Sequence, residues 1–212
     1  MNLILLGAPG AGKGTQAELL SEKLSIPAIS TGNMLREAIA NGSALGQKVK
    51  KLMDEGSLVP DDVVLDIVAE RVSRPDCSNG FILDGVPRTL PQAKALQERG
   101  IQIDHVISIE IADEVIEGRM TGRRVCSKCG ASYHIVANPP KSEDICDQCG
   151  EKLTIRKDDA PETVRHRLEV YHELTEVLKG FYADGGQLRL IDGSKPIADV
   201  NRDIMEAIGA GV

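Results

Sequence analysis

The sequence predicts an α/β protein built on a doubly wound, five-stranded parallel sheet with helices on both faces and a small inserted lobe. Short apolar segments alternate with helix-type patterns along most of the chain, beginning with the apolar run at 3–6. The glycine-rich segment 7–15 follows that run directly and leads into a helical pattern. The alternation stops between about 122 and 159, where four cysteines occur. A parallel sheet binds ligands at the carboxyl ends of its strands, so we expect the functional site at that edge.

Each strand and helix of this architecture has a local signal. Leu3 to Leu6 is uniformly apolar and predicts a buried strand, and 13–24 places apolar residues on one helix face. The Asn-Gly-Ser sequence at 41–43 separates two helices, and Pro60 begins another, with two aspartates in its first turn. Strands are expected at 3–6, 27–30, 80–84, 105–111 and 187–192, and helices at 13–24, 31–40, 46–55, 60–71, 90–99, 113–121, 161–181 and 196–208.

The segment Gly7 to Thr15, GAPGAGKGT, predicts a phosphate-binding loop (P-loop). Its glycines let backbone N–H groups approach an anion, and the following helix adds the positive end of its dipole. Lys13 supplies a mobile positive charge for the outer phosphates. The hydroxyl residue expected directly after the lysine is displaced by one position, because Gly14 precedes Thr15. The alternative, a glycine-rich turn with a solvated lysine, is disfavoured because the strand, loop and helix signals agree.

The composition of the chain disfavours two classes of binding partner, nucleic acids and membranes. The chain of 212 residues has a net charge of −7, an aromatic content of 2% and no tryptophan, which disfavours binding to nucleic acid or to anionic membranes. Its apolar runs are far shorter than the ~18–20 residues of a membrane-spanning helix. The first strand begins almost at Met1, with no export signal before it. We therefore expect a cytoplasmic protein, and nothing in the sequence indicates more than a monomer.

The four cysteines of the inserted lobe have the spacing of a metal site. They form two C-x2-C pairs separated by sixteen residues, and a glycine follows each pair. In a cytosolic protein a metal is favoured over disulfides, and a redox dithiol would need only one pair. Four thiolates would close the coordination shell, which predicts a structural zinc site, with iron or cobalt as the alternative metals. The predicted ligands are Cys126, Cys129, Cys146 and Cys149, whereas Cys77 lies outside this array as an ordinary thiol.

Charged residues near the loop suggest phosphoryl transfer. Asp84 follows the apolar segment Phe81-Ile82-Leu83, which is the position of a carboxylate that holds magnesium or its waters, although such an aspartate is often only a turn residue. Guanidinium groups match phosphate oxygens, and several arginines lie beside glycines or in predicted loops. Any one of them could be a solvated surface residue. The arginines in question are Arg36, Arg88, Arg119, Arg123, Arg124, Arg156, Arg165 and Arg167.

Taken together, these segments resemble adenylate kinases of the long-lid, zinc-bearing bacterial type, and the resemblance covers essentially the whole chain. The resemblance divides the chain into a core (1–29, 60–121 and 160–212), an AMP-binding segment (30–59) and a zinc-binding lid (122–159). Its motifs are the loop 7–15, STGNMLR at 30–36, LVPD at 58–61, DGVPRT at 84–89 with Gln92, GRR at 122–124, RKDD at 156–159 with Arg165 and Arg167, and DGSKP at 192–196.

The resemblance implies the reversible, magnesium-dependent reaction of ATP with AMP to give two ADP, and it assigns residues to each role. Lys13 would follow the transferred group, and Asp158 and Asp159 would latch the lid. The implied catalytic residues are Lys13, Arg36, Asp84, Arg88, Arg123, Arg156, Asp158, Asp159 and Arg167. The implied ATP site consists of Gly10, Ala11, Gly12, Lys13, Gly14, Thr15, Arg119, Arg123, Ser132, Tyr133 and Lys195. The implied AMP site consists of Thr31, Arg36, Ser57, Leu58, Val59, Gly85, Val86, Pro87, Arg88, Gln92, Arg156 and Arg167.

Two residues depart from the family pattern, and two other functions stay open at this point. Asn33 stands where the family usually has aspartate, and Val86 stands where it usually has phenylalanine. We expect both to tune rate or affinity without changing the reaction.

Gln92 fits adenine selection because its amide donates and accepts, but it also fits a polar residue on a helix surface. The alternatives are a kinase of UMP or CMP, and a P-loop switch whose four-cysteine lobe binds nucleic acid or protein.

Overall fold

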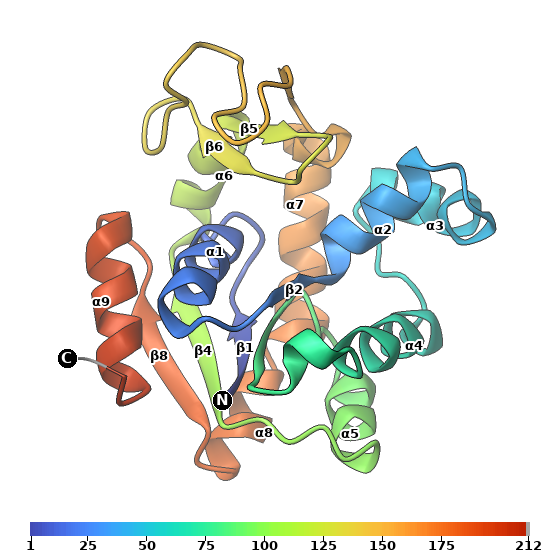
Figure 1. Ribbon diagram of the computed structural model, residues 1–212, viewed down its shortest axis with the longest axis vertical. Coiled ribbons are helices and arrows are strands. Elements are labelled where there is room, and N and C mark those ends of the chain that lie inside the picture. Colours follow the sequence, from blue (N-terminus) through green and yellow to red (C-terminus); the bar gives the residue numbers. More distant parts are fainter. Residues whose placement is uncertain (211–212) are drawn as a thin grey trace.

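The computed structural model describes residues 1–210 and contains a five-stranded parallel sheet in the order β2-β3-β1-β4-β8 (Figure 1). The predicted fold class is confirmed. β1 lies in the middle and pairs in parallel with both β3 and β4, while β2 and β8 form the edges. The strands of this sheet are β1 (Asn2–Leu6), β2 (Ala28–Ser30), β3 (Phe81–Asp84), β4 (His105–Glu110) and β8 (Leu188–Asp192).

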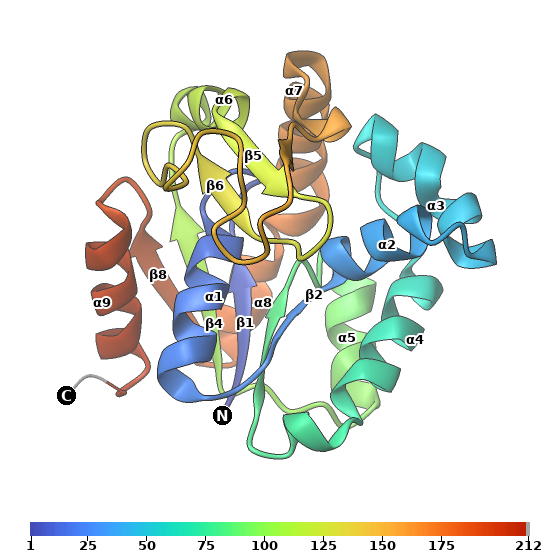
Figure 2. The same ribbon diagram turned by 45° about the horizontal axis from the view of Figure 1, so that its top comes forward.

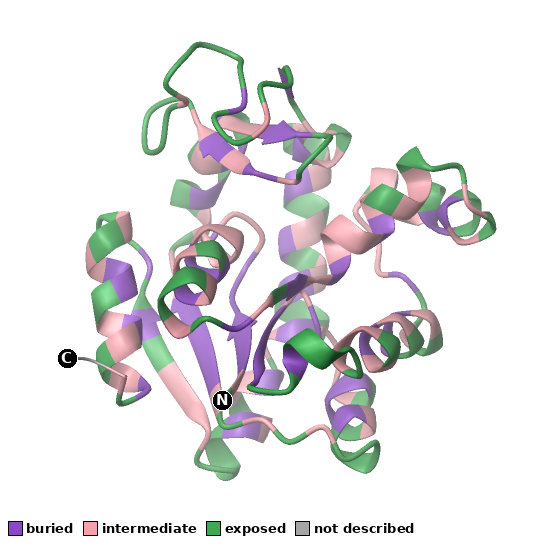
Figure 3. Cartoon of the chain, in the orientation of Figure 1, coloured by how far each residue is buried: buried purple, intermediate pink, exposed green. Residues whose placement is uncertain are grey.

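Helices cover both faces of the sheet. Leu3 and Leu5 of β1 face a core shared with α1 and α9, whereas Ile4 and Leu6 face a core shared with α4, α5 and α8. Burial on both faces explains why β1 is uniformly apolar instead of alternating, and Figure 3 shows the buried strands between exposed outer helix surfaces. The helices are α1 (Lys13–Leu24), α2 (Thr31–Ala40), α3 (Ala44–Glu55), α4 (Asp61–Val72), α5 (Leu90–Glu98), α6 (Asp113–Thr121), α7 (Pro161–Val170), α8 (Leu178–Asp184) and α9 (Ile197–Ala207).

The inserted lobe, residues 122–159, has a small sheet of its own. Its strands are β5 (Arg123–Cys126), β6 (Ser132–His134) and β7 (Leu153–Thr154), which pair antiparallel in the order β6-β5-β7. Figure 1 shows the lobe above the carboxyl end of the central sheet, and Figure 2, with the top turned forward, shows it in front of α6 and beside α7. A second projection, which we call the arm, consists of α2 and α3 and lies beside the lobe. The sequence indicated the insertion but not its strands.

The helix expected over 161–181 is not continuous. It is interrupted by a π-helical turn, Tyr171–Thr175, in which the Glu176 N–H donates to the Tyr171 carbonyl oxygen at 2.9 Å. The Thr175 hydroxyl, instead of bonding within the helix, donates to the Arg88 carbonyl oxygen at 2.8 Å. The prediction of one unbroken helix was therefore wrong, because a tertiary contact 87 residues away competes with the local pattern.

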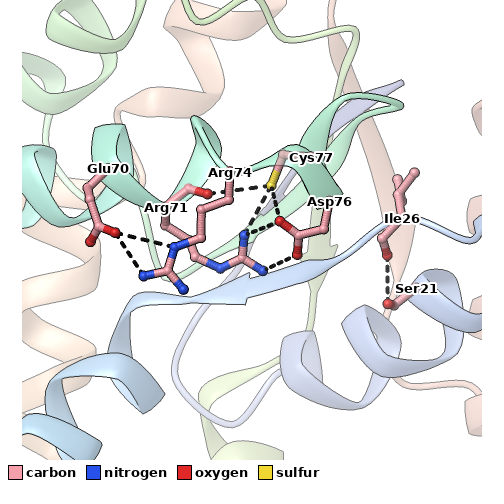
Figure 4. A network of polar contacts seen from close by, with 7 residues as sticks. All are labelled: Ser21, Ile26, Glu70, Arg71, Arg74, Asp76 and Cys77. Atoms are coloured by element: carbon pink, nitrogen blue, oxygen red, sulfur yellow. Dashed lines mark hydrogen bonds and ion pairs between the residues drawn. The ribbon is translucent and has the colours of Figure 1, made fainter.

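Cys77 belongs to a polar network at the end of α4, far from the other cysteines. It ends a 3-10 turn (Pro75–Cys77), and its buried sulfur accepts a hydrogen bond from Arg71 Nη1 at 3.2 Å. Arg71 also holds both oxygens of Asp76, at 3.0 and 2.8 Å (Figure 4). Burial raises the pKa of the Cys77 thiol, which keeps it protonated and weakly reactive.

Among residues 1–210, none of the helices has the length and apolarity needed to cross a membrane.

Candidate active site

A cavity of about 830 Å³ lies at the carboxyl ends of β1, β2 and β3, enclosed by the P-loop, the arm and the lobe. Most of the residues that the sequence singled out contribute to its wall, although they come from segments far apart in the chain. The singled-out residues that do not line it are Val86, Pro87, Arg124, Asp159, Arg165 and three of the four lobe cysteines. The sequence-predicted residues that do are Gly10, Ala11, Gly12, Lys13, Gly14, Thr15, Thr31, Arg36, Ser57, Leu58, Val59, Asp84, Gly85, Arg88, Gln92, Arg119, Arg123, Cys129, Ser132, Tyr133, Arg156, Asp158, Arg167 and Lys195.

The P-loop depends on glycines that no other residue replaces easily. Gly7 has φ +137°, and a Cβ there would lie 2.6 Å from the Ile109 carbonyl oxygen. Gly12 has φ +100° and directly precedes α1, whose first residue is Lys13. The left-handed backbone at Gly12 turns the chain into the helix, so the helix N-terminus and its free N–H groups face the cavity. This is the local geometry of an anion-binding site.

Lys13 folds back over the loop that carries it. Its Nζ donates to the carbonyl oxygens of Gly7 at 2.7 Å and Ala8 at 2.9 Å. Burial lowers the pKa of Lys13 to about 8, while Asp84 acts in the opposite direction. The ammonium group therefore stays mainly protonated at neutral pH and is held where the loop turns.

The cavity is strongly basic although the chain as a whole is acidic, with a net charge of −7. Burial, followed by the charges of Arg36 and Arg123, lowers the pKa of Arg156 to about 9, and burial lowers that of Arg167 to about 10. Crowded, desolvated cations of this kind favour a polyanionic ligand. Eight basic side chains line the wall (Lys13, Arg36, Arg88, Arg119, Arg123, Arg156, Arg167 and Lys195) against three acidic ones (Glu18, Asp84 and Asp158).

Two acidic residues at the end of the lobe hold arginines in place. Asp159 is buried and forms a two-point ion pair with Arg123, in which Arg123 Nε donates to Oδ2 at 2.8 Å. Arg167 Nη1 lies 3.0 Å from Asp158 Oδ2. Burial acts to raise the pKa of Asp158, but Arg167 and the other arginines outweigh it and hold this pKa below its usual value. Asp159 thus acts on the site through Arg123, without lining the cavity itself.

Arg88 is anchored at three points. Its backbone N–H donates to Gln92 Oε1 at 2.7 Å, its Nε donates to the Gly85 carbonyl oxygen at 2.9 Å, and its own carbonyl accepts the Thr175 hydroxyl. No sequence signal marks Thr175, because its partner is remote in the chain. The side chain of Val86, a residue that the resemblance assigns to the AMP site, packs into the core with 1% exposure.

Asn33 joins the arm to the lobe. Its Oδ1 accepts from Arg36 Nη2 at 3.0 Å and from Arg156 Nη2 at 3.5 Å. Farther out, Oδ2 of Asp54 in α3 lies 3.9 Å from Nζ of Lys157 in the lobe.

At the other end of the cavity, Arg119 donates to the Gly193 carbonyl oxygen at 2.9 Å, and Lys195 pairs with Asp203 at 2.6 Å.

The four lobe cysteines converge on one point. All four sulfur atoms lie within 4.8 Å of one another, with Cys126 and Cys149 3.4 Å apart and Cys129 and Cys146 3.5 Å apart. A zinc ion held tetrahedrally at about 2.3 Å by each sulfur needs sulfurs roughly 3.8 Å apart, so the cluster fits that ion. Gly130 and Gly150 have positive φ and close the two turns with bonds to the carbonyls of Cys126 and Cys146.

A family model and several known proteins match this chain over most of its length. A family model described as adenylate kinase matches residues 5–187 of the chain. The chain belongs to the adenylate kinase family. The adenylate kinases of Caldicellulosiruptor bescii and Lachnospira eligens are 53% and 52% identical to it over 213 aligned residues, covering 99% of this chain and 99% and 100% of theirs. That of Carboxydothermus hydrogenoformans is 52% identical over 212 residues, covering 98% of this chain and 99% of its own length.

Membership of the adenylate kinase family confirms the resemblance inferred from the motifs. It also confirms the predicted enzyme class, a nucleoside monophosphate kinase that transfers a phosphoryl group between nucleotides. The likeness extends over the lobe as well as the core, because the aligned region covers nearly the whole chain.

Proposed function

We propose that the protein catalyses the reversible transfer of the γ-phosphoryl group from magnesium-bound ATP to AMP, giving two molecules of ADP and balancing the adenine nucleotide pool. The proposal rests on one observation: a cavity lined by eight basic side chains lies at the P-loop of a chain that belongs to the adenylate kinase family. The bond between the γ-phosphorus and its bridging oxygen breaks, and a phosphate oxygen of AMP forms the new bond. Such a reaction needs positioning and charge stabilisation more than covalent chemistry, which suits this cavity.

The P-loop end of the cavity would bind ATP. The N–H groups of 10–15 would surround its β- and γ-phosphates, and Lys13 would leave the loop carbonyls for the transferred group. The base would lie at the far end, between Arg119 and the segment that carries Lys195, with Ser132 and Tyr133 from the lobe above it.

The end of the cavity beside the arm would bind AMP. Arg36, Arg88, Arg156 and Arg167 would hold its phosphate, because guanidinium groups match phosphate oxygens in two-point contacts. Thr31, Gly85 and Gln92, together with 57–59, would surround the nucleoside. Gln92 is the one of these with an amide that donates and accepts at once, so we assign base selection to it.

Asp84 would hold magnesium, directly or through water, and the four cysteines would hold zinc. Asp84 ends β3 beside Gly14, where a carboxylate faces the phosphates. When bound, magnesium neutralises charge on the phosphate oxygens. A zinc ion with four thiolates has no open position, so we assign it a structural role in the lobe.

Closure of the arm and the lobe over both nucleotides would exclude water, which would otherwise accept the phosphoryl group. In this proposal the core is 1–29, 60–121 and 160–212, and the two moving parts are 30–59 and 122–159. We further infer a cytoplasmic monomer with no nucleic-acid partner, supported by the acidic net charge and by the low aromatic content.

Phosphorus NMR of the purified protein with ATP, AMP and magnesium tests the reaction. The expected result is two ADP formed for each AMP consumed, with no accumulation of inorganic phosphate. Release of phosphate without loss of AMP would contradict the proposal and would indicate a hydrolytic P-loop protein instead.

A further inference from the structure

The side-chain amide of Gln92 is fixed in one orientation by two partners of opposite character. The Arg88 backbone N–H, which can only donate, faces Oε1 at 2.7 Å, and an Asp61 carboxylate oxygen, which accepts, faces Nε2 at 2.7 Å. Turning the amide by 180° would place its NH2 group against the N–H and its oxygen against the carboxylate. Both contacts would then be repulsive, and Gln92 is 1% exposed, so water has little access to relieve them.

Asp61 is itself held firmly. It begins α4, and its second carboxylate oxygen accepts the Thr89 hydroxyl at 3.0 Å. Thr89 in turn caps α5 by accepting the Gln92 N–H at 3.2 Å. Asp61, Thr89 and Gln92 thus form a closed ring of hydrogen bonds between two helices, and the two oxygens of Asp61 each have one defined partner.

We propose that Asp61 is a positioning residue that sets the orientation of the Gln92 amide and thereby makes the acceptor site select a 6-aminopurine over a 6-oxopurine. The proposal rests on the proposed function, in which Gln92 meets the base of the acceptor nucleotide. One N–H of Nε2 and one lone pair of Oε1 remain free after the contacts described above, and Gln92 lines the cavity.

The chemistry of the two base classes makes this orientation selective. Adenine presents an amino donor at position 6 and an acceptor at N1, which match the free oxygen and the free N–H of one amide. Hypoxanthine and guanine present the reverse order, an oxo acceptor at position 6 and an N1–H donor. An amide that could turn over would accept either class, whereas a fixed amide leaves the oxopurine with two mismatched polar contacts.

The test compares AMP with IMP, which differ in the base only at this edge, as acceptors for the wild type and the Asp61→Asn variant. Asparagine has the shape of aspartate but both donates and accepts, so residue 61 no longer favours one orientation of the Gln92 amide and only the Arg88 N–H still opposes the turned one. The matched control is Asp62→Asn, which removes the same charge from the same helix turn at an exposed side chain. The measured quantity is the ratio of kcat/KM for AMP to that for IMP, which does not depend on the fraction of active protein.

We expect the Asp61→Asn variant to lower this ratio about tenfold or more, mainly through better use of IMP, while Asp62→Asn keeps the wild-type ratio. Asp61→Leu, which removes the acceptor altogether, should lower the ratio as well. A fall of less than threefold in both Asp61 variants would overturn the inference. If the wild type itself did not prefer AMP to IMP, the base-selecting role of Gln92 in the proposed function would fail first, and the variants would not be needed to show it.

Discussion

Arg88 of the core is fixed by three hydrogen bonds from well-packed neighbours, whereas Arg123 of the lobe is fixed chiefly by one buried partner, Asp159. The core and the lobe also differ in how many apolar side chains they bury. The central sheet is buried by apolar side chains on both faces, while the core of the lobe contains five buried residues, two of them from the four-cysteine cluster. In the function we propose, Arg88 would therefore stay anchored in the core, whereas Arg123 would be carried by the lobe as it closes.

Replacing Arg88 by lysine should have the largest effect. Lysine keeps the positive charge but loses the planar fork and the Nε bond to Gly85, so we expect kcat to fall at least about hundredfold. Steady-state kinetics with a thermal melt of the same sample measures this, because the fold should be unaffected. Arg165→Lys, on the exposed side of α7, is the matched control. An Arg88→Lys variant within threefold of the wild type would show that anchoring in the core is unimportant.

Replacing Thr175 by valine tests the anchor in the π-helical turn. Valine has the shape of threonine without the hydroxyl, so the Arg88 carbonyl loses its partner, and we expect kcat to fall about fivefold. The KM for ATP should change little, because the P-loop is not touched. Thr175→Ser should restore the rate; failure of serine to restore it would assign the effect to packing and not to the hydrogen bond.

Replacing Asn33 by aspartate alters the contact between the arm and the lobe. A carboxylate would pair with Arg36 and Arg156, which lie 3.0 and 3.5 Å from the present amide oxygen, and would compete with a phosphate for them. We expect the KM for AMP to rise a few-fold while the reaction stays the same. An increase of many orders of magnitude in activity would instead mean that the native asparagine cripples the enzyme.

Removing the metal should have the smallest effect on rate. If zinc only stiffens the lobe, treatment with a chelator lowers the melting temperature and releases about one zinc per chain, while activity at low temperature is largely kept. Metal content and the thermal midpoint are measured together with activity. Immediate inactivation with an intact fold would place the metal in the chemistry and would remove the distinction between core and lobe.

The sequence predicted the core better than the lobe for a physical reason. The central strand β1 is apolar from Leu3 to Leu6 because both of its faces are buried, and that pattern is visible in the sequence alone. The lobe strands are two to four residues long and partly exposed, so neither periodicity nor apolar content marks them. The cysteine spacing predicted the cluster because metal geometry imposes short, regular intervals.

The contacts that orient the site were not predictable in the same way. The resemblance marked Arg88 and Gln92, but their partners Thr175 and Asp61 lie 87 and 31 residues away in the chain. No local pattern encodes such a pairing, because it depends on how α4, α5 and the π-helical turn pack. The same competition between local and remote contacts broke the helix expected over 161–181.

The most direct test of the account is the phosphorylation of AMP, CMP, UMP and GMP by magnesium-ATP, measured in parallel on the purified protein. We expect a strong preference for AMP, set by the fixed amide of Gln92 at the acceptor end of the cavity. A preference for a pyrimidine would keep the fold and the phosphoryl transfer but contradict the assigned acceptor. Absence of transfer to all four nucleotides would contradict the proposed function itself.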